Sequence, residues 1–199
     1  MSQFIQPRIV DDPTAVLFVI FDKTRSDKEA EGEMERTFAG VIGYLMSSPL
    51  HLSTEIGTFL PHHEEGPLTR PPGFLTILPS FQRTHVTSNA CGLLLQHAFS
   101  LPSSPQPGLG LRRVQWQTNN RNAASLDCAK RLGFKFEGIK RWDRVMPIGE
   151  DAAGNGGRVR EGDNKPRCVG RDTALFALCW DDWEDGERER IQRIMDRRF

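Results

Sequence analysis

The chain has 199 residues, and its 26 lysines and arginines balance 26 aspartates and glutamates, so its formal net charge at pH 7 is zero. This length is enough for one domain with a sizeable hydrophobic core. The balanced charge disfavours general binding to nucleic acid or to an anionic membrane surface, because both need an excess of basic residues. A local basic cluster that holds a phosphorylated ligand is still compatible with this composition.

The sequence predicts a cytoplasmic protein. Its N-terminus lacks a basic segment followed by an apolar core, and its longest apolar run is far shorter than a membrane span. The cysteines have no short paired spacing, so we expect reduced thiols and no zinc site at Cys91, Cys128, Cys168 and Cys179.

Hydrophobic patterning predicts the elements in chain order. Strands are expected over residues 16–22, 38–46, 52–60 and 74–78, then a helix over 82–99, a strand from 113, a helix begun by Asn122, strands over 134–146 and 173–180, and a helix over 187–198. The apolar stripe of the first helix includes Leu93, and that of the second includes Ala124. This order predicts a mixed α/β fold with helices on the faces of one sheet.

Three segments interrupt or end this pattern within a predicted single domain over residues 1–199. Residues 61–73 are rich in proline, glycine and histidine and form an insertion, in which the run His62 to Glu65 is only a weak indication of a metal. Residues 148–169 have low hydrophobicity and are expected to form a flexible loop. Residues 184–199 form the expected C-terminal helix.

The segment Arg113–Gly138 is the most informative part of the chain. It begins with alternating apolar and polar residues, as in a half-buried strand. Asn122 is a good N-cap for the helix that follows, and Gly133 stands where a helix C-terminus favours a left-handed residue. An amide and a hydroxyl at one helix start, from Asn122 and Ser125, indicate a polar ligand there.

This pattern resembles the end of the acyl-CoA-binding core in the GNAT superfamily of N-acetyltransferases, and more narrowly its ribosomal-protein N-terminal acetyltransferase branch. The signature Asn-x-x-Ser, then Ala-x-[Lys/Arg]-Leu-Gly-Phe-x-x-Glu-Gly, is matched by Asn122, Ser125, Ala129, Arg131, Leu132, Gly133, Phe134, Glu137 and Gly138. Residues 79–84 (PSFQRT) and 170–176 (GRDTALF) match a sub-branch in the right order. The resemblance extends from Leu17 to Trp183.

The resemblance implies a mostly antiparallel GNAT-like sheet flanked by helices. The family fold normally begins with one more strand and two helices, so this fold is expected to be N-terminally shortened. Acetyl-CoA is the implied co-substrate, with its pyrophosphate at a helix start where backbone N–H groups and the helix dipole favour an anion. The residues expected there, in place of the usual glycine-containing motif, are Gln82, Arg83, Thr84, His85, Val86 and Thr87.

The resemblance also implies roles for residues of the second expected helix, which begins at Asn122. Asn122 resembles the family asparagine that hydrogen-bonds the pantetheine arm, and Arg131 of the matched signature is a further expected cofactor contact. Ser125 resembles a serine that helps to protonate the leaving thiolate, although a first-turn serine is also common without any function. Tyr44, the only tyrosine, stands on an early strand and is not expected to take this role.

Glu55 is the candidate general base. It lies in Ser-Thr-Glu-Ile-Gly, which resembles the Glu-Ile-Gly strand of the family, and a carboxylate among apolar neighbours is suited to accept a proton through water. An exposed strand glutamate is the alternative. His85 is a second candidate base on chemistry alone, and Asp172 either orders the last strand or faces the acceptor. Two alternatives stay open for Trp142, Trp180 and Trp183: they line a pocket for the acceptor, or they belong to the hydrophobic core.

The sequence thus predicts an acetyl-CoA-dependent N-acetyltransferase. The amine of the acceptor attacks the thioester directly while both substrates are bound, and a small-molecule primary amine is the first expectation for the acceptor. A protein N-terminus is the second. A GNAT-like accessory protein that binds without turnover is the alternative from another class, whereas nucleic acid and membrane partners are not expected.

Overall fold

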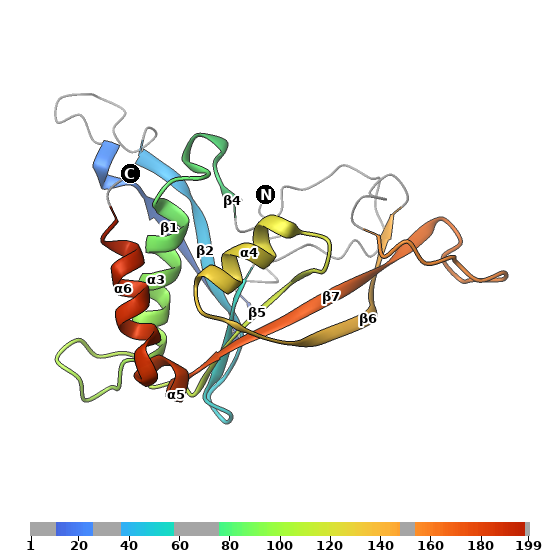
Figure 1. The fold of residues 1–199 in the computed structure, drawn as a ribbon. Coiled ribbons are helices and arrows are strands. Elements are labelled where there is room, and N and C mark those ends of the chain that lie inside the picture. The colour runs from blue at the N-terminus through green and yellow to red at the C-terminus, as the bar shows by residue number, and fades with distance from the viewer. Residues whose placement is uncertain (1–10, 26–36, 58–75, 148–153, 198–199) are drawn as a thin grey trace. The chain divides into compact units, whose positions relative to one another are not determined.

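The computed structural model describes residues 11–25, 37–57, 76–147 and 154–197. The chain forms two compact units, one of Met1–Val114 with Trp180–Phe199 and the other of Gln115–Cys179. Each unit has its own strands and helices (Figure 1). The single domain over residues 1–199 stays a prediction, and the predicted insertion over 61–73, with His62 to Glu65, lies outside the described residues.

The first unit contains antiparallel strands arranged around β2 (Phe38–Ser48). β2 pairs on one edge with β1 (Val16–Phe21) and on the other with β3 (Ser53–Gly57) and the short β4 (Thr76–Ile77). The pairing of β2 with β3 is irregular near Met46, which has a left-handed φ of 48°. All these pairs are antiparallel, as the sequence predicts.

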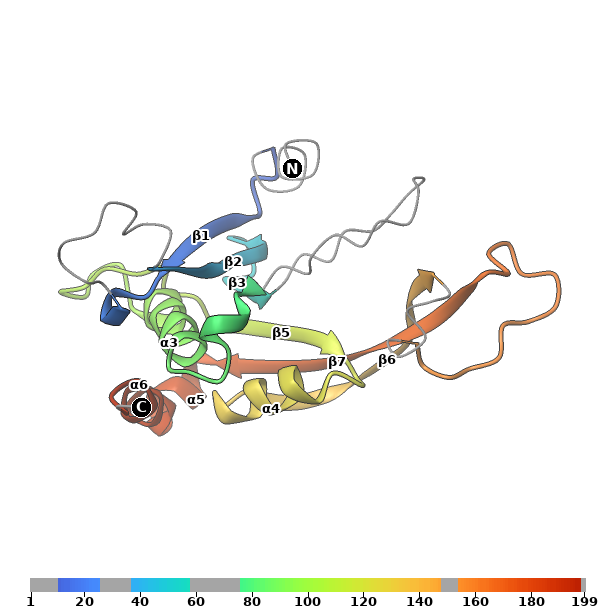
Figure 2. The ribbon, with the colours of Figure 1, turned by 90° about the horizontal axis from the view of Figure 1, so that it is seen from above.

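Two helices of the first unit lie side by side. α3 (Val86–Phe99) and α6 (Arg188–Met195) run next to each other in both views (Figures 1 and 2). The expected C-terminal helix is thus present as α6, and it buries Ile191 and Ile194. The short helical segments of this unit are η2 (Lys23–Arg25), η3 (Pro79–Phe81), α5 (Trp180–Asp182) and η5 (Trp183–Glu187). η5 is kinked, because Asp185 and Gly186 have non-helical backbone conformations.

The start of α3 corrects the sequence prediction. The expected helix over 82–99 begins only at Val86, because the separate turn η3 precedes it and Arg83 has a left-handed φ of 61° that no α-helix accommodates. Leu93 was expected on the apolar stripe, but it is 59% exposed. The helix nevertheless buries a broader face than its sequence indicates, because Cys91, Leu95 and Phe99 are also buried.

The second unit contains the predicted strand–helix–strand segment. β5 (Arg113–Asn119), α4 (Ala123–Arg131), β6 (Lys135–Pro147) and β7 (Cys168–Cys179) follow in chain order, and β7 lies between β5 and β6. Gly133 ends the helical segment with a φ of 83°, as predicted. Ala124 is exposed, contrary to expectation, so the buried face of α4 begins at Cys128.

β6 and β7 form a long antiparallel ribbon (Figure 2). β7 was expected over 173–180 but begins at Cys168, because Cys168 to Arg171 continue the pairing with the end of β6. Part of the loop predicted over 148–169 is therefore strand. Residues 154–167 are irregular, with turns only in the C-terminal half of the segment, and residues 148–153 lie outside the described residues.

The apolar interior agrees with most of the expected buried positions. Trp116, Cys91 and Cys128 are buried, and all four cysteines are free thiols. Tyr44 is also buried, and its hydroxyl donates to the carbonyl oxygen of Leu94, while burial raises the pKa of this phenol above its ordinary value. This side chain therefore has a structural place, as the sequence indicates.

Candidate functional site

Glu55 lies in the middle of β3 and is only 7% exposed, which excludes the alternative of an exposed strand glutamate. The neighbouring Thr54 and Ile56 are each 1% exposed, so both faces of β3 are covered here. A Cβ added to Gly57 would lie 2.8 Å from Glu55 Oε1. The carboxylate therefore extends along the strand to the position that Gly57 leaves open.

The turn before α3 uses several of its predicted ligand groups for its own structure. Gln82 Nε2 donates to the carbonyl oxygen of Ile77 at 3.0 Å, and the Thr84 hydroxyl donates to the carbonyl oxygen of Phe81 at 2.6 Å. Val86 is buried in a cluster of Ala39, Ile77 and Phe81. These side chains build the turn, and the backbone N–H of Val86 donates to the Thr84 hydroxyl at 3.3 Å, so Val86 offers no free donor to a ligand.

Arg83 differs from its neighbours. Its side chain is exposed and has no partner among the described residues, and its φ of 61° places a non-glycine residue in the left-handed region. Within the described ranges, the backbone N–H groups of Arg83, Thr84 and Thr87 also have no acceptor. A cation and several outward N–H groups at the start of a 14-residue helix suit an anion.

His85 stands at the N-cap position of α3 and contacts a buried carboxylate. Its Nε2 lies 3.3 Å from Asp22 Oδ1, which also accepts hydrogen bonds from the backbone N–H and the hydroxyl of Thr24. Burial opposes ionisation of Asp22, but the hydrogen bonds from Thr24 and the contact with His85 together lower its pKa below the ordinary value. His85 therefore joins the end of β1 to the start of α3, which gives it a structural role.

Asn122 and Ser125 lie together at the start of α4, as predicted. Asn122 Oδ1 caps the helix by accepting from the backbone N–H of Ser125 at 3.1 Å. The buried Trp116 donates its indole N–H to Ser125 Oγ at 3.0 Å. This contact occupies a lone pair of the oxygen and leaves the hydroxyl proton available to a ligand. The sequence gives no sign of this contact, because Trp116 reads only as a core residue.

Asn120 is a second group that the sequence analysis missed. Its Oδ1 is buried and has no hydrogen-bond partner among the described residues, although it lies in the same turn as Asn122. A buried acceptor without a donor costs about 1–3 kcal/mol. An N–H group of a bound amide would satisfy this oxygen, and pantetheine contains two amides. The turn before α4 therefore fits the group that the resemblance implies.

Arg131 is not brought next to Asn122. It lies in the last turn of α4, about 13 Å from the helix start at 1.5 Å per residue. Its Nη2 lies 3.7 Å from Cys128 Sγ. An arginine contact with the same part of a ligand as Asn122 therefore has no support in this helix.

The candidate groups are divided between the two units. Glu55 and the turn before α3 belong to the first unit, whereas Asn122, Ser125 and Arg131 belong to the second. Their joint action on one ligand therefore stays a prediction.

The mostly antiparallel α/β fold, with a strand–helix–strand unit that carries a capping asparagine and a hydrogen-bonded serine, is consistent with a GNAT acetyltransferase domain. A family model described as an acetyltransferase (GNAT) domain matches residues 3–135, which is more than half of the chain. The chain belongs to the GNAT acetyltransferase family. The predicted enzyme class is thus confirmed, while the ribosomal-protein branch stays a prediction.

Solved structures of the same family share this fold. A GCN5-related N-acetyltransferase from Brucella melitensis is 21% identical with a TM-score of 0.62, and the match covers 98% of this chain and 65% of that one. A probable acetyltransferase of the GNAT family from Chromobacterium violaceum is 27% identical with a TM-score of 0.57, covering 88% of this chain and 61% of that one. The chain thus spans less than two thirds of each of these relatives.

A more distant structure has a named substrate. A spermidine N-acetyltransferase from Vibrio cholerae is 14% identical with a TM-score of 0.50, and the match covers 87% of this chain and 70% of that one. At this identity the likeness concerns the fold alone. No curated protein matches the sequence. Among the described residues, no helix is long and apolar enough to cross a membrane.

Proposed function

We propose that this chain transfers the acetyl group of acetyl-CoA to the primary amine of a small molecule, by direct transfer while both substrates are bound. The observation that carries the proposal is the start of α4, where the capping Asn122, the Ser125 hydroxyl and the buried, unpaired acceptor of Asn120 lie within six residues of the chain. Membership of the GNAT family supports acetyl-CoA as the donor. The four free cysteines support a reducing compartment such as the cytoplasm.

In this proposal, groups at the starts of two helices, α3 and α4, bind acetyl-CoA. At α3, the Arg83 guanidinium and the backbone N–H groups of Arg83, Thr84 and Thr87 bind the pyrophosphate. At α4, the amide N–H groups of Asn122 and the Oδ1 of Asn120 bind the amides of the pantetheine arm. Gln82, His85 and Val86 shape the first of these two positions, and Arg131 is left without a defined contact to the donor.

Glu55 is the proposed general base. In the proposed step the amine nitrogen forms a bond to the thioester carbonyl carbon, its surplus proton passes through water to the Glu55 carboxylate, and the carbon–sulfur bond breaks. Its buried place in β3 supports this role, because a base shielded from bulk water is held in one orientation.

Ser125 is proposed to assist departure of the thiolate. Its oxygen accepts the Trp116 indole N–H, so the serine O–H can donate a hydrogen bond to the developing negative charge on sulfur. A donor fixed in advance costs no reorganisation when the charge appears.

The function is tested by two measurements on the full chain. Isothermal titration with acetyl-CoA measures binding, and release of free thiol in the presence of an amine panel measures turnover. The panel contains small primary amines and a short peptide with a free N-terminus, so it separates the two acceptor classes. Binding followed by thiol release with small amines supports the proposal. Binding without turnover on any amine supports the accessory protein, and no binding rejects both.

The base is tested by Glu55→Gln. We expect kcat to fall by about 100-fold or more, because removal of a general base has effects of that size, while acetyl-CoA affinity is unchanged. Glu161→Gln, at an exposed position of the second unit, is the matched control and should behave as the wild type. Equal turnover of wild type and Glu55→Gln across pH would exclude Glu55 as the base.

A further inference from the structure

Trp142 lies at a bulge in β6 and has an unfavourable backbone conformation. The strands are in register at Lys140, opposite Thr173, and again at Arg144, opposite Arg171, so three residues of β6 face only Asp172. Trp142 has a φ of 53°, which is strained for a bulky side chain. It is nevertheless 53% exposed, so burial of the indole does not explain why this conformation is kept.

Two glycines make room for the indole. A Cβ added to Gly170 would overlap Trp142 Cε3 and lie 2.5 Å from Cζ3, and one added to Gly157 would lie 2.7 Å from Cζ2. Any larger residue at either position would displace the ring. The benzene half of the indole therefore rests against backbone, and the orientation of the exposed ring is fixed.

A network of hydrogen bonds around Asp172 and Asn155 stabilises the bulge. Asp172 Oδ1 accepts from the backbone N–H of Trp142 at 2.8 Å and from Asn155 Nδ2 at 3.0 Å. Asn155 also donates its backbone N–H to the carbonyl oxygen of Gly170 and accepts from the N–H of Gly157. The hydrogen bonds from Asn155 and Trp142 lower the pKa of Asp172, so this carboxylate is ionised at neutral pH.

The bulge adjoins the turn before α4. The carbonyl oxygen of Asp172 accepts from the backbone N–H of Asn120 at 3.2 Å, and a Cβ added to Gly156 would lie 2.7 Å from Arg121 Nη2. Both contacts lie within the second unit. The bulge that carries the exposed indole therefore contacts the turn before α4. The proposed function places the pantetheine arm at this turn, and the acceptor must approach that arm.

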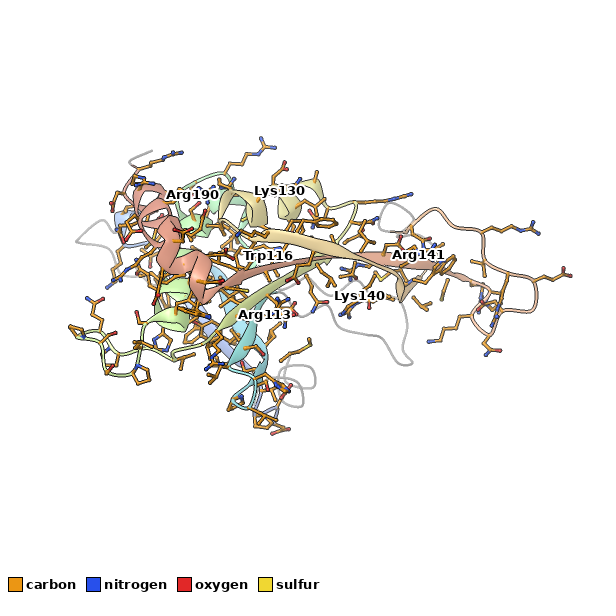
Figure 3. The ribbon with its side chains drawn as sticks, turned by 60° about the horizontal axis from the view of Figure 1, so that its bottom comes forward. Arg113, Trp116, Lys130, Lys140, Arg141 and Arg190 are labelled. Carbon is orange, nitrogen blue, oxygen red and sulfur yellow. The ribbon has the colours of Figure 1, made fainter. Side chains whose placement is uncertain are left out.

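We propose that the exposed surface of Trp142 is a stacking platform for the acceptor, and that the acceptor is an amine with a flat aromatic body. The inference rests on the proposed function, because it names the substrate class of that site. Aromatic rings stack on a fixed indole with offset or edge-to-face geometry. Arg121 and Arg141 act on Asp172 through their charge, and Figure 3 shows Lys140 and Arg141 on the ribbon. This positive charge disfavours a polycationic acceptor such as spermidine.

The first test is nuclear magnetic resonance of the indole N–H groups in the full chain. The chain has four tryptophans, and the signal lost in Trp142→Phe identifies Trp142. The probes are 2-phenylethylamine and butylamine, which share a primary amine but differ in the ring. We expect 2-phenylethylamine to shift the Trp142 signal at concentrations where butylamine does not. No shift, or equal shifts with both amines, would overturn the platform.

The second test is kinetic. We expect Trp142→Ala to raise the KM for 2-phenylethylamine about three- to tenfold, with the KM for butylamine and the affinity for acetyl-CoA unchanged. Trp180→Ala is the matched control, because Trp180 is 49% exposed but lies in the other unit. An equal rise of KM for both amines would show a merely structural role and overturn the proposal.

The two proposals fail in different ways. Loss of the platform leaves acetyl-CoA binding and thiol release with other amines intact. An absence of acetyl-CoA binding would reject the proposed transferase, and the resonance measurement on the unmodified protein would still decide whether Trp142 contacts an aromatic amine.

Discussion

The contact between Glu55 and Gly57 joins the candidate base to a strand position without a side chain. The carboxylate oxygen lies only 2.8 Å from the point that a Cβ of residue 57 would occupy. Because the two residues are on the same face of β3, the glycine determines how far the carboxylate can lie along the strand. A residue that sequence reading treats as a strand breaker therefore becomes part of the candidate site.

Gly57→Ala tests this contact. The added methyl group must displace the Glu55 carboxylate, so we expect kcat to fall about 10- to 100-fold with little change in acetyl-CoA affinity. The measurement compares kcat in the wild type, both single variants and the double variant with Glu55→Gln. If the methyl group acts through Glu55, the double variant is no slower than Glu55→Gln. An equal further decrease in that background would show that Gly57 acts by another route.

At the scale of elements, α4 depends on Asn122 for its first turn, and the proposed function gives the same side chain a ligand. Capping uses Oδ1, whereas binding of the pantetheine arm uses the amide N–H groups. The two roles therefore belong to different atoms and can be separated by substitution.

Asn122→Ser and Asn122→Ala make this separation. Serine caps a helix about as well as asparagine, so only the alanine variant should lose about 1 kcal/mol of unfolding free energy. Both variants lack the amide N–H groups, and we expect both to bind acetyl-CoA about three- to tenfold more weakly. Denaturant unfolding and isothermal titration measure the two effects. Wild-type affinity in Asn122→Ser would leave Asn122 with capping alone.

Asp22 connects three elements of the first unit: the end of β1, η2 through Thr24, and the start of α3 through His85. Its folded pKa lies below the ordinary value of 3.8. A lowered pKa adds stability that is fully present above the pKa of the unfolded chain. This stability is lost as the pH falls through the folded pKa.

Asp22→Asn should therefore destabilise the chain at pH 6, and the difference from the wild type should shrink as the pH falls below about 4. Unfolding by denaturant at a series of pH values measures this difference. Asp127→Asn is the control, since Asp127 is exposed on α4 and its carboxylate makes no hydrogen bond among the described residues. A pH-independent difference would mean that the Asp22 charge contributes nothing.

The sequence predicts elements well where periodicity and caps agree. β5, α4, the Asn122 cap and the left-handed Gly133 all follow from local patterns. It fails where an unusual backbone conformation or a contact distant in the chain decides. The late start of α3 depends on the backbone of Arg83, and the early start of β7 depends on pairing with β6. A sequence pattern also cannot predict that the Trp116 indole donates to Ser125, or that Gly157 and Gly170 make room for the Trp142 ring.

At the scale of the whole molecule, the proposed function requires groups from both compact units to act on one donor. Arg83 belongs to the first unit and Asn122 to the second. Acetyl-CoA has chemically distinct parts for the two: the pyrophosphate for Arg83 and the pantetheine arm for Asn122. A donor fragment without the pyrophosphate, S-acetylpantetheine, therefore reports on the second unit alone.

We expect Arg83→Ala to weaken acetyl-CoA binding about ten- to hundredfold, as loss of a charged hydrogen bond would, and to leave S-acetylpantetheine binding unchanged. Asn122→Ser should weaken both ligands by the same factor. Isothermal titration of both variants measures these effects, with Arg158→Ala as a control at another exposed arginine. If Arg83→Ala binds acetyl-CoA like the wild type, or weakens the fragment equally, the start of α3 does not hold the pyrophosphate. The two units would then not share the donor, even if the start of α4 does bind its arm.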